Sequence, residues 1–275
     1  MAHTLAHLWC IAPLNRLDKP ISRNPLQSKM LPFGARTPAE LRDKGIVVVL
    51  GMHRSGTSAI AGMLADHGIE LGPVSQQNRF NPRGNREIRE LNRLHDRILE
   101  RSGGAWWDPP ARISPGRGDY RRRNEILRSI PGETIGIKDP RLLLVLDLWR
   151  DLEPRPIGVI RNPVAVRDSL QRRAHERARR HPQLSAAAWD ELWLTYNRAL
   201  LAEHRRRPFP VIDFDRHADL DAQMRGALVF HGLELATESD FFDRDLAGSP
   251  ADDWRSRASG ETLELWDTLA ALAAR

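Results

Sequence analysis

The sequence has little cysteine, little lysine and no long apolar run. Its single cysteine, Cys10, cannot form a disulfide within the chain, which is typical of a protein from a reducing compartment. No apolar run approaches the roughly 20 residues of a membrane-spanning helix. The weak apolar patch near the N-terminus is interrupted by histidine and proline and lacks a small-residue cleavage site. We therefore expect a cytoplasmic protein without a signal peptide or a transmembrane segment.

The basic charge comes almost entirely from arginine. Only four of the 42 basic residues are lysines, and the net charge is +6. Many arginines have acidic neighbours at helical spacing, and a basic balance suits an anionic small molecule as well as it suits nucleic acid. We therefore expect no nucleic-acid partner. The basic tract 172–180 is expected to be a solvated helix face, and the alternative is peripheral contact with an anionic membrane or lipid head group.

Residues 1–44 and 45–275 differ in pattern. The first stretch shows no sustained periodicity and is expected to be a poorly ordered extension. The second alternates short β-branched runs with helical patterns, which predicts a single α/β domain, a three-layer parallel sheet with helices on both faces. Strands are expected at 46–50, 134–138, 156–161 and 210–214, and helices at 57–67, 85–101, 119–129, 141–152, from Pro163 onward, 185–204 and 220–232.

The loop after the first predicted strand is built to hold an anion. It reads Gly51-Met52-His53-Arg54-Ser55-Gly56-Thr57-Ser58, and backbone N–H groups in such a loop form a concave anion site with the start of the next helix. Thr57 stands where a triphosphate-binding loop has lysine, and neither Asp139 nor Asp213 is a persuasive magnesium ligand. We therefore expect a bound phosphate and sulfuryl group without a metal ion. The alternative is a plain strand-to-helix turn with Ser55 as the helix cap.

The segment 47–58 resembles the 5′-phosphosulfate loop of sulfotransferases that use 3′-phosphoadenosine-5′-phosphosulfate. It is most similar to the bacterial and Golgi-type variants that read Arg-Ser-Gly-Thr. The resemblance covers about residues 46–245. It implies a P-loop NTPase-like fold and the sulfated nucleotide as the donor substrate. It also implies that the loop residues hold the 5′-phosphosulfate: Gly51, Arg54, Ser55, Gly56, Thr57 and Ser58.

A second anion site is predicted after the third strand. Because the carboxyl ends of parallel strands meet at one edge of a sheet, the loops after Leu50, Lys138 and Arg161 are expected to converge. Arg161 and Ser169 resemble the arginine and serine that grip the 3′-phosphate in this family, and arginine donates two hydrogen bonds to one phosphate. The family's basic C-terminal segment is not found. Arg255 and Arg257 are substitutes that the spacing does not support.

Lys138 ends a predicted strand in a segment, 135–141, that resembles one of bacterial sulfotransferases. A lysine buried at a sheet edge needs an anionic partner, either Asp139 or the ligand. A salt bridge and a helix cap are weighed equally with a role in the site.

The candidates for the base are Glu87 and His53. Glu87 falls on one helical stripe with Leu91, Leu94 and Ile98, and an acid on a core-facing stripe is unusual unless it is paired or functional. The segment 81–92 resembles the one that carries the glutamate base in bacterial sulfotransferases, although its two aromatic positions hold asparagine and arginine here. A histidine such as His53 is poised near neutral pH, and it is equally suited to orienting the sulfate.

Taken together, these patterns predict a metal-independent sulfotransferase that acts on a hydroxyl of a small molecule, saccharide or glycolipid. Trp106 and Trp107, in a loop rich in glycine and proline, either stack on a sugar ring or pack the loop down. Trp189 and Trp193 are expected in the core. The alternatives are a P-loop kinase, and a nucleotide-binding protein of the same fold without turnover. Arg54 is grouped with Glu87 and His53 as a catalytic residue because positive charge is needed where negative charge develops.

Overall fold

The computed structural model describes residues 37–74, 83–176, 182–234 and 253–274. Most of the extension assigned to residues 1–44 lies outside the described residues. Its last part contains a short helix, α1 (Ala39–Arg42), whose Leu41 is buried in the core. None of the described helices is long and apolar enough to cross a membrane.

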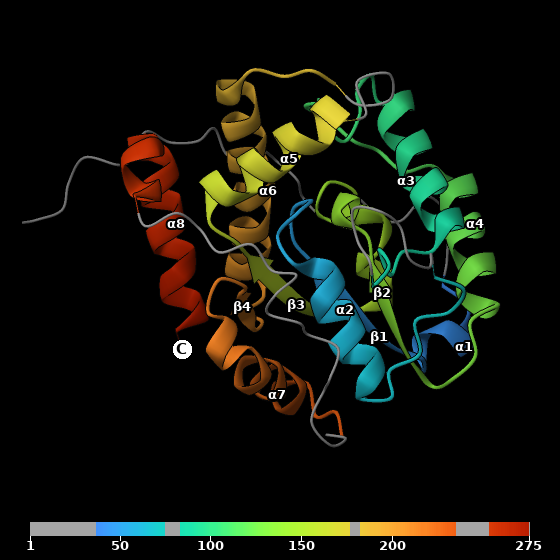
Figure 1. Cartoon of the computed structure of the whole chain (residues 1–275). Coiled ribbons are helices and arrows are strands. Elements are labelled where there is room, and N and C mark those ends of the chain that lie inside the picture. Colours follow the sequence, from blue (N-terminus) through green and yellow to red (C-terminus); the bar gives the residue numbers. More distant parts are fainter. Residues whose placement is uncertain (1–36, 75–82, 177–181, 235–252, 275) are drawn as a thin grey trace, which may run out of the picture.

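Four parallel strands form the sheet, which confirms the predicted fold class. The strands lie in the order β2-β1-β3-β4, and every neighbouring pair is parallel (Figure 1). Their bounds agree with the predicted strands to within one or two residues. They are β1 (Gly45–Leu50), β2 (Thr134–Lys138), β3 (Arg155–Ile160) and β4 (Val211–Asp213).

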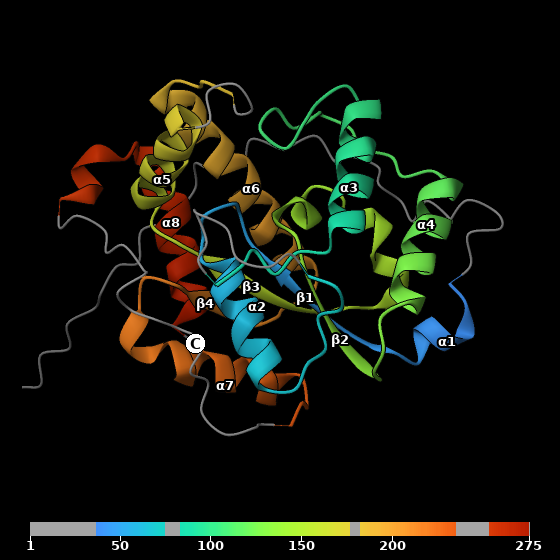
Figure 2. The ribbon, with the colours of Figure 1, turned by 45° about the vertical axis from the view of Figure 1, so that its right-hand side comes forward.

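Helices cover both faces of this sheet because both faces of its central strand are apolar. Along β1, Val47 and Val49 belong to the core under α2 (Thr57–Asp66) and α7 (Leu220–Phe230). Alternate residues of the strand point to the opposite core, as the two-residue period of a strand requires. That core is covered by α3 (Arg89–Arg101), α4 (Arg117–Arg128) and α6 (Ala186–Arg206), as Figure 2 shows.

The prediction of a helix over 141–152 is wrong. The segment forms three short 3₁₀ turns, and it begins where the Asp139 carboxylate accepts a hydrogen bond from the Arg141 amide beside Pro140. Leu142, Leu148 and Trp149 are buried all the same. An apolar spacing of three and four residues therefore does not separate an α-helix from successive 3₁₀ turns. The turns are Pro140–Leu143, Leu146–Leu148 and Arg150–Leu152.

Two further helices complete the domain. The helix α5 (Pro163–Glu176) begins at Pro163, as predicted. The helix α8 (Gly260–Ala273) was not predicted, although Ser259 caps it by accepting a hydrogen bond from the Thr262 amide. A serine before the apolar run of α8 is the sequence signal that identifies such a helix start.

Gly56, the residue before α2, packs against Phe214, which follows β4. Its φ is +86°, and a Cβ atom there would lie 2.2 Å from the ring of Phe214. Gly68 has a similar φ of +81°, but a Cβ atom there meets nothing within 4 Å. The two glycines therefore share a backbone conformation and differ in packing.

Gly56→Ala is expected to lower the free energy of unfolding by about 2–4 kcal/mol, from left-handed strain and overpacking together. Gly68→Ala is the matched control and should cost about 1–2 kcal/mol, from strain alone. Chemical denaturation of both variants measures the difference. Equal losses would show that the contact with Phe214 does not constrain the loop.

Candidate functional site

The predicted anion loop lies at the carboxyl edge of the sheet, between β1 and α2. Gly51 is buried, and a Cβ atom there would come within 2.7 Å of the Val159 carbonyl on β3. Arg54 adopts a left-handed conformation with φ 69°. Since α2 begins at Thr57, the amides of Thr57 and Ser58 are among the first of the helix and have no partner within it. The loop has the backbone geometry that a bound anion requires.

Arg54, Arg161 and Ser169 are joined by hydrogen bonds. The Arg161 guanidinium donates to the backbone carbonyl of Arg54 at 3.0 Å, and Nε of Arg54 donates to the Ser169 hydroxyl at 2.9 Å. Ser169 is buried on α5, and Arg161 follows directly after β3. The structure therefore brings the two predicted anion sites together, as the convergence of strand ends requires.

Positive charge is concentrated around Arg54. Burial is the main cause that lowers the pKa of Arg54 to about 10, and the nearby Arg173, Arg161 and Arg172 lower it further. Asp215 lies 3.5 Å from Arg161 and partly offsets this charge. We predicted that the basic tract 172–180 is a solvated face. Arg172 is exposed but Arg173 is half-buried, both act on Arg54, and residues 177–180 lie outside the described residues.

Lys138 and Glu87 form an ion pair beside the anion loop. The Lys138 ammonium donates to Glu87 at 2.5 Å and to the Ser58 hydroxyl at 3.1 Å, and both side chains are largely buried. Asn92 donates a second hydrogen bond to Glu87 at 2.7 Å. The partner of Lys138 is thus Glu87 and not the adjacent Asp139. Glu87 lies before α3 and not on it, because the helix begins at Arg89.

The residue after Lys138 belongs to a buried polar network. Asp139 is fully buried and contacts His95 Nδ1 at 2.8 Å and the Arg141 guanidinium at 3.0 Å. Burial acts to raise the pKa of Asp139, but Arg141 and His95 outweigh it and hold this pKa well below its usual range. Trp149 donates to His95 Nε2 at 3.2 Å, so the other ring nitrogen of His95 carries the proton toward Asp139.

This network fixes the turn that follows Lys138, and sequence reasoning missed His95 and Arg141. A histidine on the apolar stripe of α3 is the signal that would have pointed to His95. The carboxylate of Asp139 is engaged by these two partners. Among the described residues, no group of three or more histidine, cysteine or acidic side chains is placed to hold a metal ion.

His53 is buried under the loop that follows α3. Its ring lies 4.2 Å from that of Trp106 and 6.1 Å from that of Tyr196, which also donates a hydrogen bond to the Trp106 carbonyl at 3.0 Å. Burial lowers the pKa of His53 well below its usual value, and Arg141 adds to this effect. Nε2 of His53 is buried and has no hydrogen-bond partner in the described part of the chain. The ring is thus neutral, and the hydrogen-bonding capacity of its Nε2 atom is not used by the described residues.

The predictions for the four tryptophans have different outcomes. Trp189 and Trp193 lie in the core, as predicted. Trp106 is buried and packs the loop down onto His53, whereas Trp107 is 38% exposed.

Arg255 and Arg257 are engaged elsewhere. Arg255 pairs with Asp267 on α8, and Arg257 pairs with Asp168, the neighbour of Ser169. The pair of Arg257 and Asp168 places the C-terminal segment beside α5. It gives neither arginine a contact with Arg54 or Arg161.

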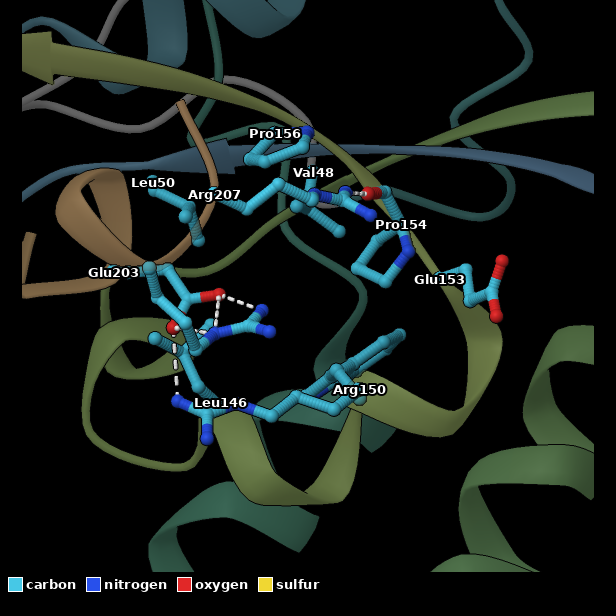
Figure 3. Close-up of a pocket in the computed structure, with 11 residues that line it drawn as sticks. Val48, Leu50, Leu146, Arg150, Glu153, Pro154, Pro156, Glu203 and Arg207 are labelled. Carbon is cyan, nitrogen blue, oxygen red and sulfur yellow. Dashed lines mark hydrogen bonds and ion pairs between the residues drawn. The ribbon is translucent and has the colours of Figure 1, made fainter. Parts of the chain in front are cut away.

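A separate pocket lies beside the start of β3 (Figure 3). Its lining includes Val48, Pro156 and Glu203, and Glu203 accepts hydrogen bonds from Arg150 and Arg206. None of the predicted site residues lines this pocket.

Comparison with known proteins finds no matching family model and no matching curated protein. Solved structures do match. A sulfotransferase from Alicyclobacillus acidocaldarius has a TM-score of 0.52 at 17% identity, over 84% of this chain and 96% of that one. The sulfotransferase domain of the Synechococcus PCC 7002 olefin synthase has 0.49 at 19% identity, over 85% and 97%. Mouse sulfotransferase SULT7A1, complexed with PAP, has 0.43 at 15%, over 87% and 90%. The match to the Alicyclobacillus acidocaldarius structure shows that the chain has the fold of that sulfotransferase.

Asp139→Asn is expected to lower the free energy of unfolding at pH 7 by about 3 kcal/mol, because it removes one of the two counter-charges of the buried Arg141 and the carboxylate partner of the buried His95. A depressed carboxyl pKa stabilises the fold above the unfolded pKa of about 3.9, and this stabilisation is lost as the pH falls toward the folded value. The difference between the wild type and the variant should therefore shrink below about pH 4.

Chemical denaturation at neutral and acidic pH measures this difference. Asp147→Asn removes an exposed ion pair with Arg150 and should cost only about 0–1 kcal/mol. A difference between wild type and Asp139→Asn that stays constant with pH would contradict the role given to the charge.

Proposed function

We propose that this protein is a sulfotransferase that moves a sulfuryl group from 3′-phosphoadenosine-5′-phosphosulfate to a hydroxyl of a small molecule, saccharide or glycolipid. The observation that carries the proposal is the pair of hydrogen bonds that joins Arg54 to Arg161 and Ser169. A ligand with one anionic group at the start of α2 and another at Arg161 and Ser169 matches this arrangement. The proposed donor carries a 5′-phosphosulfate and a 3′-phosphate.

In this proposal the anion loop holds the 5′-phosphosulfate. The amides at the start of α2 and the Arg54 guanidinium face its negative charge, while the buried hydroxyl of Ser169 and the fork of Arg161 hold the 3′-phosphate. Gly51 and Gly56 are required by the close approach of Val159 and Phe214, which keeps the loop narrow. Ser55 and Thr57 are buried at the same loop, and their hydroxyl groups are further candidates to bind the phosphosulfate.

Glu87 is the proposed base. As the acceptor oxygen bonds to sulfur, the bond from sulfur to the 5′-phosphate oxygen breaks, and the acceptor proton passes to the Glu87 carboxylate. Lys138 then loses its counter-charge while negative charge develops on the leaving phosphate. Its ammonium, which already contacts Ser58 at the start of α2, is placed to stabilise that charge. The nucleotide bisphosphate leaves.

His53 has a different proposed role. Its ring is neutral because burial lowers its pKa, and its Nε2 atom has no hydrogen-bond partner among the described residues. A neutral imidazole in this position orients the sulfuryl group or the acceptor hydroxyl by a hydrogen bond. It is the alternative base if Glu87 is not required.

Arg161→Ala is expected to weaken the binding of adenosine 3′,5′-bisphosphate by about 10- to 100-fold more than the binding of adenosine 5′-monophosphate. The reason is that a charge-assisted hydrogen bond contributes about 1.5–3 kcal/mol. Isothermal titration with both nucleotides measures the ratio. Arg155→Ala, at the opposite end of β3, is the matched control and should leave both affinities unchanged. Equal losses for the two nucleotides would remove the 3′-phosphate from Arg161.

Glu87→Gln is expected to fold and to bind adenosine 3′,5′-bisphosphate, yet to lose transfer by at least about 100-fold, the usual contribution of a general base. Transfer of labelled sulfate to acceptors from a screened panel measures the rate. Glu90→Gln, three residues away, is the control and should keep the wild-type rate. An unimpaired rate in Glu87→Gln would assign the base to His53.

A further inference from the structure

One basic stretch of the chain lies outside the proposed anion sites. Residues 83–128 contain twelve arginines against seven aspartates and glutamates, so their net charge is +5. This stretch comprises α3, α4 and the loop between them, and the two helices lie side by side (Figures 1 and 2). The two neighbouring helices therefore carry an excess of positive charge.

The charge on α3 forms a line. Arg89, Arg93, Arg97 and Arg101 recur at every fourth residue, which places successive side chains about 6 Å apart along the helix. All four are exposed, and like charges at this spacing repel one another. Arg101 is neutralised by Asp119 on α4. The other three form no side-chain hydrogen bond or ion pair with the residues that the structure describes.

Further exposed cations lie on the neighbouring helix and in the loop before it. Arg117 and Arg121 lie on α4, and Arg112 lies in the loop before it. All three are exposed and, like those on α3, make no ion pair within the described ranges. We call these six side chains the arginine track: Arg89, Arg93, Arg97, Arg112, Arg117 and Arg121.

The arginine track begins at the proposed base. The helix α3 starts two residues after Glu87, and Asn92 in its first turn donates a hydrogen bond to Glu87. Arg89 and Arg93 flank Asn92 in the sequence. A molecule whose hydroxyl reaches Glu87 can therefore continue along α3 and meet a cation at each turn.

We propose that the acceptor is an acidic saccharide chain that lies along the arginine track with one hydroxyl at Glu87. This inference rests on the proposed function and names its acceptor class. The guanidinium fork matches the carboxylate or sulfate groups of such a chain. Arg89 and Arg97 are separated by about 12 Å along the helix, which exceeds the span of a single sugar ring.

Two other anionic partners fit this surface less well. A membrane surface needs apolar side chains to insert, and the exposed pair Val229 and Phe230 lies on α7, on the other face of the sheet. Single-stranded nucleic acid needs several exposed aromatic side chains for stacking. Between residues 83 and 128, Trp107 is the one large exposed apolar side chain.

The test compares two triple variants of equal charge. Arg89→Ala, Arg93→Ala and Arg97→Ala together remove half of the arginine track. Arg42→Ala, Arg205→Ala and Arg225→Ala together remove three arginines that lie on other elements. The probe is a fluorescently labelled oligosaccharide of alternating uronic acid and sulfated hexosamine, and a neutral glucose oligosaccharide of equal length is its control. Fluorescence anisotropy at constant salt gives the dissociation constants.

The track variant is expected to bind the acidic probe about tenfold or more weakly than the wild type, with a shallower salt dependence. The control variant should bind it as the wild type does, and the neutral probe should not bind measurably. Equal binding by the two triple variants would overturn the inference. So would tighter, track-dependent binding of single-stranded DNA or of vesicles of anionic phospholipid.

A separate measurement distinguishes failure of this inference from failure of the proposed function. Both triple variants should bind adenosine 3′,5′-bisphosphate with the wild-type affinity, which also shows that they fold. If the wild type binds the acidic probe through the track but does not bind the nucleotide, the donor assignment fails and the surface stands. If it binds the nucleotide but neither triple variant differs with the acidic probe, the surface fails and the donor assignment stands.

Discussion

The hydrogen bond from the Arg161 guanidinium to the backbone carbonyl of Arg54 joins the end of β3 to the loop that follows β1. Its acceptor belongs to a residue in a left-handed conformation, which costs about 1–2 kcal/mol and persists only where the surroundings impose it. Gly51 and Gly56 lie so close to Val159 and Phe214 that neither position has room for a Cβ atom. These close approaches constrain the rest of the loop. The shape of the anion loop therefore depends on β3 and β4 as much as on its own residues.

Charge balance differs between the two sides of this loop. On the side of β2, Lys138 is countered by Glu87, and Arg141 is countered by Asp139 and Asp96. On the side of β3, Arg54 is surrounded by other arginines, and Asp215 is the acid beside Arg161. Burying cations together is unfavourable unless an anion joins them. The imbalance supports the proposal that the second side binds the more highly charged part of a ligand.

The sequence predicted the sheet well because the signal for each strand lies in a few adjacent residues. Short β-branched runs bounded by glycine, proline or charged residues predicted all four strands. The alternation of these runs with helices predicted that the strands are parallel. It failed where one local pattern fits two structures. Leu142, Leu148 and Trp149 have the spacing of an α-helix, yet Pro140 and the cap by Asp139 favour 3₁₀ turns. Glu87 was placed on a helix that begins two residues later.

The sequence by itself determined that a glycine loop follows the first strand and that an arginine follows the third, because both depend on residues adjacent in the chain. Only the tertiary structure decided which side chains meet. Glu87 and Lys138 are 51 residues apart, and Arg54 and Ser169 are 115 apart. Trp106 packs on His53, and its carbonyl accepts a hydrogen bond from Tyr196 on α6. These contacts join residues far apart in the sequence, and they form only when distant segments pack together.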